Sequence, residues 1–223
     1  MPQAQPNTDP VPRMQAQAGG MFLPPVLASG SPQRTAILTQ LGIPHTIVVA
    51  DVEEVMTGDP DAVAEGNARA KAHEVHQRQP IATVIGSDTI VLTEDGEILG
   101  KPADLDEARE MLGKLLGRSH VVVSGLAIAG PGRRTTRSGV DRTTVHMRTL
   151  PSEALERHLA HGEWEGRAGA YAIQGRGGGL VERIDGDYLN VVGLPVALMA
   201  RLAPELLDRG PRKGTAAPQG TGE

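Results

Sequence analysis

The chain has 223 residues, a formal net charge of −5 and no cysteine, which excludes disulfides, thiolate nucleophiles and Cys-ligated zinc. It holds one tryptophan, two tyrosines and one phenylalanine, too few for the stacking platforms of single-strand binders. Because the charge balance is acidic, the chain also lacks the basic footprint of a DNA or RNA binder, and we expect no nucleic-acid polymer as a partner.

The two ends of the chain differ in composition from its middle. Residues 1–20 carry one basic residue, Arg13, and no apolar run, so they do not resemble a secretory signal, and Met21 is an alternative start. We expect disordered tails at 1–20 and 209–223, around one folded domain at 21–208. No stretch reaches the ~18 apolar residues of a membrane span, so we expect a cytoplasmic protein without membrane contact.

The folded part alternates strand-like and helix-like patterns. Ser31-Pro32 and Asp59-Pro60 each place a capping oxygen before a proline at the first helical position. Asp104 is a third cap, and Glu94-Asp95-Gly96 predicts a hairpin turn. The expected strands cover 26–28, 46–50, 82–85, 90–92, 98–99, 121–128, 143–147, 171–173 and 180–184. The expected helices cover 32–41, 60–77, 105–115, 151–158 and 195–207. This alternation predicts an α/β fold with a mixed sheet.

Several familiar signatures are missing or weak. No GxxxxGK[ST] or GxSxG occurs, and the glycine run at 175–179 misses the GxGxxG spacing. The pairs His73/His76 and His158/His161 have a helical spacing that suits a metal, but polar helix faces often carry such pairs without any ligand role. The arginine-rich loop Arg133–Arg137 is typical of a solvated hairpin end.

The segment Leu27–Arg34 has the pattern of an anion site. A tight turn that leads into a helix exposes unpaired backbone N–H groups at the positive end of the helix dipole. Ser29 and Ser31 add hydroxyl donors, and Arg34 adds a bidentate cation. A capped helix start without a ligand explains the same residues.

The segment Gly86–Ile90 places Asp88 at the expected carboxyl end of an apolar strand. Open α/β sheets bind ligands at such ends. The carboxylate suits a general base or a ligand of a hard cation such as magnesium. An aspartate in an ordinary turn is the competing interpretation.

Two lysines complete a consistent site. Lys71 lies on a helix otherwise lined by alanine, and Lys101 lies in a rigid Gly-Lys-Pro turn. Read alone, each is more typical of solvated surface. Read together with Arg34, and with Asp88 and Glu54 opposite, they fit a polyphosphate held with a metal ion.

Taken together, these segments resemble those of one family, the Maf proteins, which are nucleoside triphosphate pyrophosphatases related in fold to the inosine triphosphatases. The resemblance extends over nearly all of residues 26–202 and rests on an ordered set of blocks. These are LASGSP (27–32), EE (53–54), AKA (70–72), GSDTIV (86–91), GKP (100–102), GRSH (117–120), AGAYAIQG (168–175) and NVVGLP (190–195). It implies a twisted mixed sheet in two lobes with a deep central cleft, often in a homodimer. It also implies hydrolysis of a nucleoside triphosphate to the monophosphate and pyrophosphate with a divalent cation, Mg²⁺ or Mn²⁺.

The resemblance also implies roles for individual residues. Asp88 would be the proton acceptor, and Glu54 a second acidic residue at the metal or the attacking water, so that both would hold the metal. Lys101 would act at the reacting phosphates, which Ser29, Arg34 and Lys71 would help to bind. Such chemistry suits a site made of positioned positive charge, because attack on the α-phosphorus builds negative charge on the phosphate oxygens.

Base specificity depends on three further positions. The dTTP/UTP-directed subgroup is similar at Thr89 and Gln174, which that subgroup uses to read the base. It usually carries arginine after Pro32, where this chain has Gln33. We therefore expect a preference for dTTP and UTP, or a broader range.

Two other functions compete with this interpretation. One is a nucleotide-binding regulator of septum formation that does not turn over its ligand. The other is a pyrophosphatase for modified purine triphosphates. The presence of Asp88, Glu54 and both lysines favours turnover, and the sequence blocks favour the Maf branch.

Overall fold

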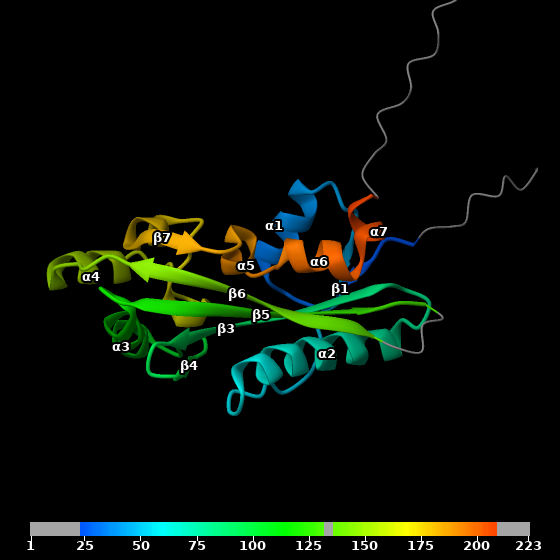
Figure 1. The fold of residues 1–223 in the computed structure, drawn as a ribbon, viewed down its shortest axis with the longest axis horizontal. Helices are drawn as coiled ribbons and strands as arrows, with labels where there is room; N and C mark the ends of the chain where they lie inside the picture. The colour runs from blue at the N-terminus through cyan, green and yellow to red at the C-terminus, as the bar shows by residue number, and fades with distance from the viewer. Residues whose placement is uncertain (1–22, 132–135, 209–223) are drawn as a thin grey trace, which may run out of the picture.

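The computed structural model describes residues 23–131 and 136–208 (Figure 1). The tails expected at 1–20 and 209–223, the alternative start at Met21 and residues 133–135 of the arginine-rich loop lie outside the described residues. Arg137, the last residue of that loop, begins a strand and pairs with Glu205.

One mixed sheet organises the described chain. The strands are β1 (Val26–Leu27), β2 (Thr46–Ile47), β3 (Val84–Thr93), β4 (Ile98–Leu99), β5 (Ser119–Ala129), β6 (Arg137–Met147) and β7 (Val181–Asp185). Their order is β2-β1-β3-β5-β6-β7, with β4 paired to β3 outside this path. The short strand β1 runs parallel to β2 and β3, whereas all other pairs are antiparallel. The predicted mixed α/β sheet is therefore confirmed.

The helices cover the sheet unevenly. They are α1 (Pro32–Gln40), α2 (Pro60–Arg78), α3 (Leu105–Leu115), α4 (Ser152–Leu159), α5 (Tyr188–Val192), α6 (Val196–Leu202) and α7 (Pro204–Leu207), with 3₁₀ turns η1 (Ala168–Ala170) and η2 (Arg176–Leu180). Helix α2 packs along one face of the long strands, and α1, α5, α6 and α7 lie on the other (Figure 1). In the described ranges, no helix combines the length and the apolar character needed to cross a bilayer.

The local start signals act largely as expected. Asp59 caps α2 by accepting from Ala62 N, and Asp104 caps α3 by accepting from Glu107 N. Ser31 precedes α1 but makes no side-chain cap, because its hydroxyl donates to Gln33 Oε1 instead.

Two glycines let α2 approach the sheet closely. A Cβ at Gly86 on β3 would lie 2.3 Å from Ala68 O, and one at Gly125 on β5 would lie 2.0 Å from Ala64 O. Only glycine allows a helix backbone this near to a strand. This close contact sets the height of α2 above β3.

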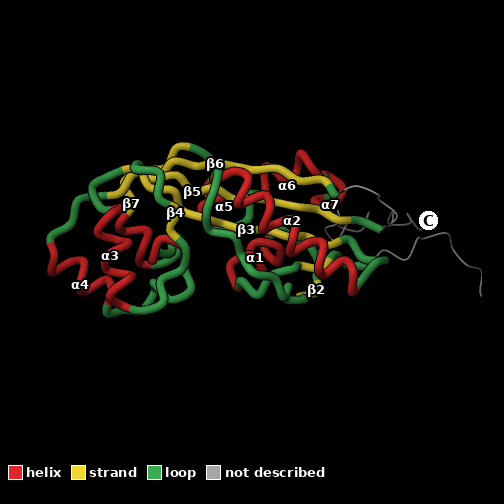
Figure 2. The backbone as a smooth tube through the Cα atoms, turned by 90° about the horizontal axis from the view of Figure 1, so that it is seen from below, coloured by secondary structure: helices red, strands yellow, loops and turns green. Residues whose placement is uncertain are grey.

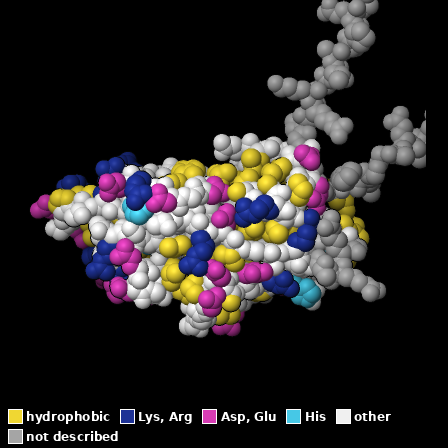
Figure 3. Space-filling view, viewed as in Figure 1, with side chains coloured by type: hydrophobic (Ala, Val, Ile, Leu, Met, Phe, Trp, Pro, Cys, Tyr) yellow, Lys and Arg dark blue, Asp and Glu magenta, His cyan; other side chains and the backbone are white. Residues whose placement is uncertain are grey.

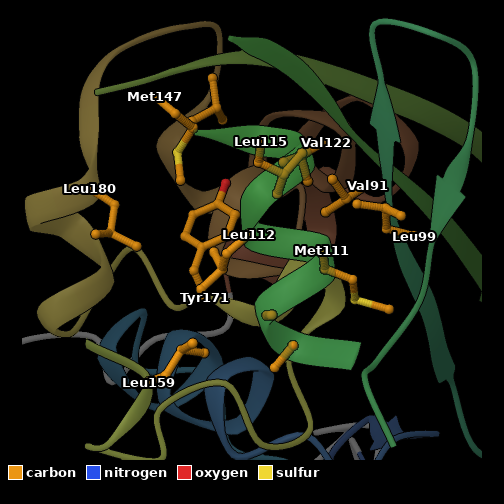
Figure 4. Close-up of a cluster of buried hydrophobic side chains, with 13 residues drawn as sticks. Val91, Leu99, Met111, Leu112, Leu115, Val122, Met147, Leu159, Tyr171 and Leu180 are labelled. Carbon is orange, nitrogen blue, oxygen red and sulfur yellow. The ribbon is translucent and has the colours of Figure 1, made fainter. Parts of the chain in front are cut away.

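The molecule has two lobes at opposite ends of the long strands (Figure 2). One lobe holds β1, β2, α1, α6 and α7, and its core includes Leu27, Ile37 and Leu126. The other holds α3, α4, β4 and β7, and its core surrounds Tyr171, which points among Leu112, Met147 and Leu180 (Figure 4). On the face shown in Figure 3, acidic and basic side chains of the described residues are mixed, without a stripe of one sign.

Several local predictions were wrong. Strand β3 does not end at Asp88 but continues to Thr93, so Asp88 lies in mid-strand. Residues 171–173 are not a strand: they follow a 3₁₀ turn that ends with Ala170 at φ 63°, and a further turn begins at Ile173. The predicted last helix breaks before Pro204, since proline disfavours the helical conformation at Ala203, which has φ −149° and ψ 64°.

Candidate active site

A cleft of about 760 Å³ lies between the two lobes. Its walls come from the β1–α1 turn, the loop before α2, the middle of β3, the Lys101 turn and the segment 165–174. Every residue predicted for the site lines this one cleft: Ser29, Gln33, Arg34, Glu54, Lys71, Asp88, Thr89, Lys101 and Gln174. Its volume lies in the usual range for sites of nucleotide-sized ligands.

An ion-pair bridge lies at the floor of the cleft. Lys71 Nζ lies 2.6 Å from Asp88 Oδ1 and 2.6 Å from Glu54 Oε1. Lys71 and Asp88 are buried, at 8% and 5% exposure, whereas Glu54 is exposed. Because buried charges are costly unless they are paired, the lysine stabilises two acidic groups that would otherwise repel each other.

The fold brings these groups together from distant parts of the chain. Asp88 projects from the middle of β3, and Lys71 reaches it from the helix that Gly86 and Gly125 hold against the sheet. Glu54 comes from a loop without regular secondary structure. The site therefore depends on the packing of α2 as well as on local sequence.

Arg34 is buried and largely engaged by protein acceptors. It donates from Nε to Gly193 O at 2.8 Å, from Nη1 to Ser29 Oγ at 2.9 Å and from Nη2 to Thr89 Oγ1 at 3.1 Å. Burial lowers the pKa of Arg34 below its ordinary value, and the charges of Asp88 and Glu54 oppose that shift. The guanidinium stays charged and orients two hydroxyls of the site.

The candidates for reading the base differ in how much hydrogen-bonding capacity the protein leaves for a ligand. Thr89 Oγ1 accepts from Arg34 and lies 3.0 Å from Ser124 Oγ, so the protein already uses most of its bonding capacity. Gln33 is half-buried and accepts from Ser31 Oγ through Oε1, which leaves its amide N–H groups without a protein acceptor among the described residues. Gln174 is exposed at the opposite wall.

Lys101 lies in an exposed turn that is tied to the second lobe. Gly100 O accepts from Gly169 N at 3.0 Å, which joins this turn to the segment that carries Gln174. In the described part of the chain, no acidic side chain pairs with Lys101. Its ammonium is therefore available to a ligand in the cleft.

Arg167 is a cation that the sequence analysis missed. It lines the cleft two residues before Gly169, which bonds the Lys101 turn. Its Nε is buried without a hydrogen-bond partner, and no carboxylate of the described chain pairs with it. The signal was present, because a basic residue directly precedes the block AGAYAIQG.

Asn67 is a second missed residue. It is buried at 3% exposure and donates from Nδ2 to Asp88 Oδ2 at 2.9 Å. Its spacing of four residues from Lys71 puts both on one face of α2. That spacing was the signal in the sequence.

Beneath the cleft, Tyr171 forms a buried polar pair with His120. Tyr171 Oη lies 2.8 Å from His120 Nε2, with the rings edge to face. Burial lowers the pKa of His120 to about 4 and raises that of Tyr171, so both are neutral at pH 7. Ala170, which precedes Tyr171, has φ 63°, a strained value that often accompanies functional segments.

The donor set limits how a metal ion can be held. No group of three or more histidine, aspartate or glutamate side chains in the described ranges is placed to hold a metal, and this includes both helical histidine pairs. Glu54 and Asp88 offer two carboxylates at the floor of the cleft. Magnesium is commonly bound by one or two carboxylates together with substrate phosphates, so these residues fit a cation that is shared with a nucleotide.

Comparisons with known proteins identify relatives of this chain. A family model described as "Maf-like protein" matches residues 24–206. A dTTP/UTP pyrophosphatase of Dictyoglomus thermophilum is 42% identical over 82% of this chain and 97% of the relative. Proteins of the same name from Symbiobacterium thermophilum and Myxococcus xanthus are 44% and 45% identical, over 77% and 79% of this chain and 88% and 91% of theirs. The solved structure of the Staphylococcus aureus Ham1 protein aligns with a TM-score of 0.40 and 18% identity, over 55% of this chain and 70% of that one. With a family model that covers most of its length and relatives above 40% identity, the chain belongs to the Maf-like protein family.

Proposed function

We propose that the chain is a nucleoside triphosphate pyrophosphatase, which hydrolyses a (d)NTP to the monophosphate and pyrophosphate. The observation that carries this proposal is the bridge Glu54–Lys71–Asp88 at the floor of a cleft whose walls bear Lys101 and Arg167. The cleft thus combines carboxylates that can accept a proton and bind a metal ion with basic side chains that can bind a polyphosphate. The curated relatives named dTTP/UTP pyrophosphatase support the same reaction.

The reaction assigns a step to each group. A water oxygen attacks the α-phosphorus, its proton passes to the Asp88 carboxylate, and the bond from the α-phosphorus to the bridging oxygen breaks. The bonding electrons leave with pyrophosphate. Lys71 holds Asp88 in position, while Lys101 and Arg167 stabilise the charge that builds on the phosphates. Arg34 acts mainly by orienting Ser29 and Thr89.

A divalent cation, Mg²⁺ or Mn²⁺, completes the proposed site. Glu54 and Asp88 would hold it together with phosphate oxygens, and when bound it neutralises charge on the reacting phosphates. The exposed Glu54 is the more accessible ligand of the two.

For the base, we propose dTTP and UTP, or a broader range. Gln33 and Gln174 present amides from different segments of the cleft wall, and Thr89 lines the same cleft from β3. A pyrimidine ring offers both donors and acceptors to such amides. Because Gln33 is neutral, it places no cation against the base or the ribose.

We further propose a cytoplasmic homodimer, in keeping with the Maf resemblance. Light scattering coupled to gel filtration measures the oligomeric state. A measured mass that corresponds to one chain at micromolar concentration would contradict the proposed dimer.

One experiment tests the function and its alternatives. Pyrophosphate release is measured from a panel of canonical and modified triphosphates, with and without Mg²⁺ or Mn²⁺. Release from dTTP and UTP supports the proposal. Pyrophosphate release only from a modified purine triphosphate would show that the substrate is of that class instead. Tight nucleotide binding without pyrophosphate release would favour a nucleotide-binding regulator.

A further inference from the structure

The loop that carries Glu54 has little to hold it in place. Residues 51–58 form no helix or strand, and no hydrogen bond between two main-chain groups of the described chain involves them. Val55, next to Glu54, is 55% exposed. Yet the proposed reaction needs Glu54 at a fixed place beside Asp88.

A single buried side chain holds this loop at two points. Asn67 Oδ1 accepts from Val55 N at 2.9 Å, and Asn67 Nδ2 donates to Val55 O at 2.9 Å. The two bonds pair the N–H and the carbonyl of one loop residue, as the backbone of a neighbouring strand would. They also fix which way the amide points, because the Val55 N–H needs an acceptor and its carbonyl needs a donor.

The same amide reaches the proposed proton acceptor. The second N–H of Asn67 Nδ2 bonds Asp88 Oδ2 at 2.9 Å, on the oxygen that Lys71 does not contact. Both donors of the amide are therefore used, one on the loop and one on Asp88. Leucine has the same branched shape but makes none of these bonds, so core packing alone does not require an amide at this buried position.

We propose that Asn67 is a positioning residue, whose amide sets the distance and orientation of Glu54 relative to Asp88. This inference rests on the proposed pyrophosphatase function. Asn67 acts through the two acidic groups and contacts neither the water nor the phosphates. Lys71 supplies the opposite charge between these groups, and Asn67 supplies their geometry.

The kinetic test uses Asn67→Leu, which keeps the branched shape of the side chain and removes the three bonds. We expect kcat to fall about 10- to 100-fold with KM for the triphosphate changed by less than about threefold, because misplaced groups slow chemistry while Lys101 and Arg167 still bind phosphate. In a Glu54→Gln background, the same change should cost no more than about threefold, because the residue being positioned is already impaired. A kcat like that of the wild type, or losses that multiply in the double variant, would overturn the proposal.

A matched control separates positioning from general loosening of the loop. Glu74 on α2 accepts from Asp51 N at 3.3 Å and so tethers the other end of the same loop without touching Asp88. Glu74→Leu removes this acceptor and should leave kcat within about twofold of the wild type. An equal loss of kcat in both variants would overturn the specific role of Asn67.

Two further measurements keep the inference testable if Asn67→Leu does not fold or if the wild type shows no turnover. Asn67→Asp keeps an acceptor for Val55 N but no donor, so its kcat should fall at least as far as that of Asn67→Leu; a kcat like that of the wild type would overturn the proposal. Hydrogen exchange at the Val55 amide reports the contact without any substrate. Exchange should be slow in the wild type and at least about tenfold faster in Asn67→Leu or, where that variant does not fold, in Asn67→Ala, because neither offers Val55 N an acceptor. Equal exchange would overturn the proposal even in a protein without pyrophosphatase activity.

Discussion

Lys71 Nζ lies 2.6 Å from Asp88 Oδ1, and the two residues are brought together by the packing of α2 on β3. The same ammonium also bridges to Glu54. One ammonium therefore contacts both acidic groups before any ligand enters the cleft.

Asp88→Asn should abolish most hydrolysis and preserve nucleotide binding. The amide keeps the shape of the side chain but cannot accept the proton of the attacking water, and a lost general base costs about 10²- to 10⁴-fold in rate. Pyrophosphate release measures the rate, and calorimetry with a non-hydrolysable triphosphate measures the binding. Turnover close to that of the wild type would remove Asp88 as the proton acceptor.

Lys71→Met should lower both stability and rate. Without the ammonium, buried Asp88 loses its ion-pair partner, and breaking such a pair costs about 3 kcal/mol in free energy of unfolding. Urea denaturation measures this loss. Adding Asp88→Asn to Lys71→Met should recover part of it, because the uncompensated charge is gone. If the double variant is no more stable than Lys71→Met, the electrostatic account fails.

Gly86→Ala and Gly125→Ala should destabilise the protein by at least about 3 kcal/mol. Each new Cβ would meet the backbone of α2, at 2.3 Å from Ala68 O or 2.0 Å from Ala64 O, and a backbone cannot move aside as a side chain does. Gly66→Ala is the matched control, since a Cβ there meets nothing within 4 Å on the exposed side of α2. It should stabilise by about 0.5–1 kcal/mol. Thermal unfolding of the three variants distinguishes a specific contact from a general intolerance of alanine.

These glycines also show which features of the fold can be predicted from the sequence alone. Caps at Asp59 and Asp104 and the hairpin turn were predictable because they depend on neighbours within a few residues. Every predicted site residue lines one cleft, but the family resemblance suggested that convergence, not any spacing. The position of α2 above β3 comes from contacts between residues about 18 to 61 apart, which no local pattern encodes.

The errors have equally specific causes. The strand through Asp88 seemed to end there because Gly86-Ser87-Asp88 reads as a turn, whereas the glycine serves the close approach of α2. Asn67 was overlooked because an asparagine within a helix has no fixed meaning until its partners are known. The break before Pro204 was visible in the sequence and should have ended the helix.

Arg167→Gln should weaken the binding of phosphates and leave the binding of the nucleoside unchanged. If Arg167 contacts the phosphates that leave, KM for every triphosphate and the inhibition constant of pyrophosphate should rise about tenfold, while inhibition by the nucleoside alone is unaffected. Arg157→Gln is the control, because that arginine is exposed on α4 outside the cleft. A change confined to one base would assign Arg167 to base reading instead.

The buried His120–Tyr171 pair should make stability depend on pH on the acid side. Burial lowers the pKa of His120 in the folded state to about 4 from 6.5, so the unfolded chain binds a proton that the folded chain refuses. The contribution is complete above pH 6.5 and is lost as the pH falls toward 4, by about 3 kcal/mol in total. The double variant His120→Leu with Tyr171→Phe removes the titrating ring without leaving the hydroxyl unpaired. Urea denaturation at several pH values between 4 and 7 should show a shallower acid slope in this variant than in the wild type, and identical slopes would contradict a neutral buried His120.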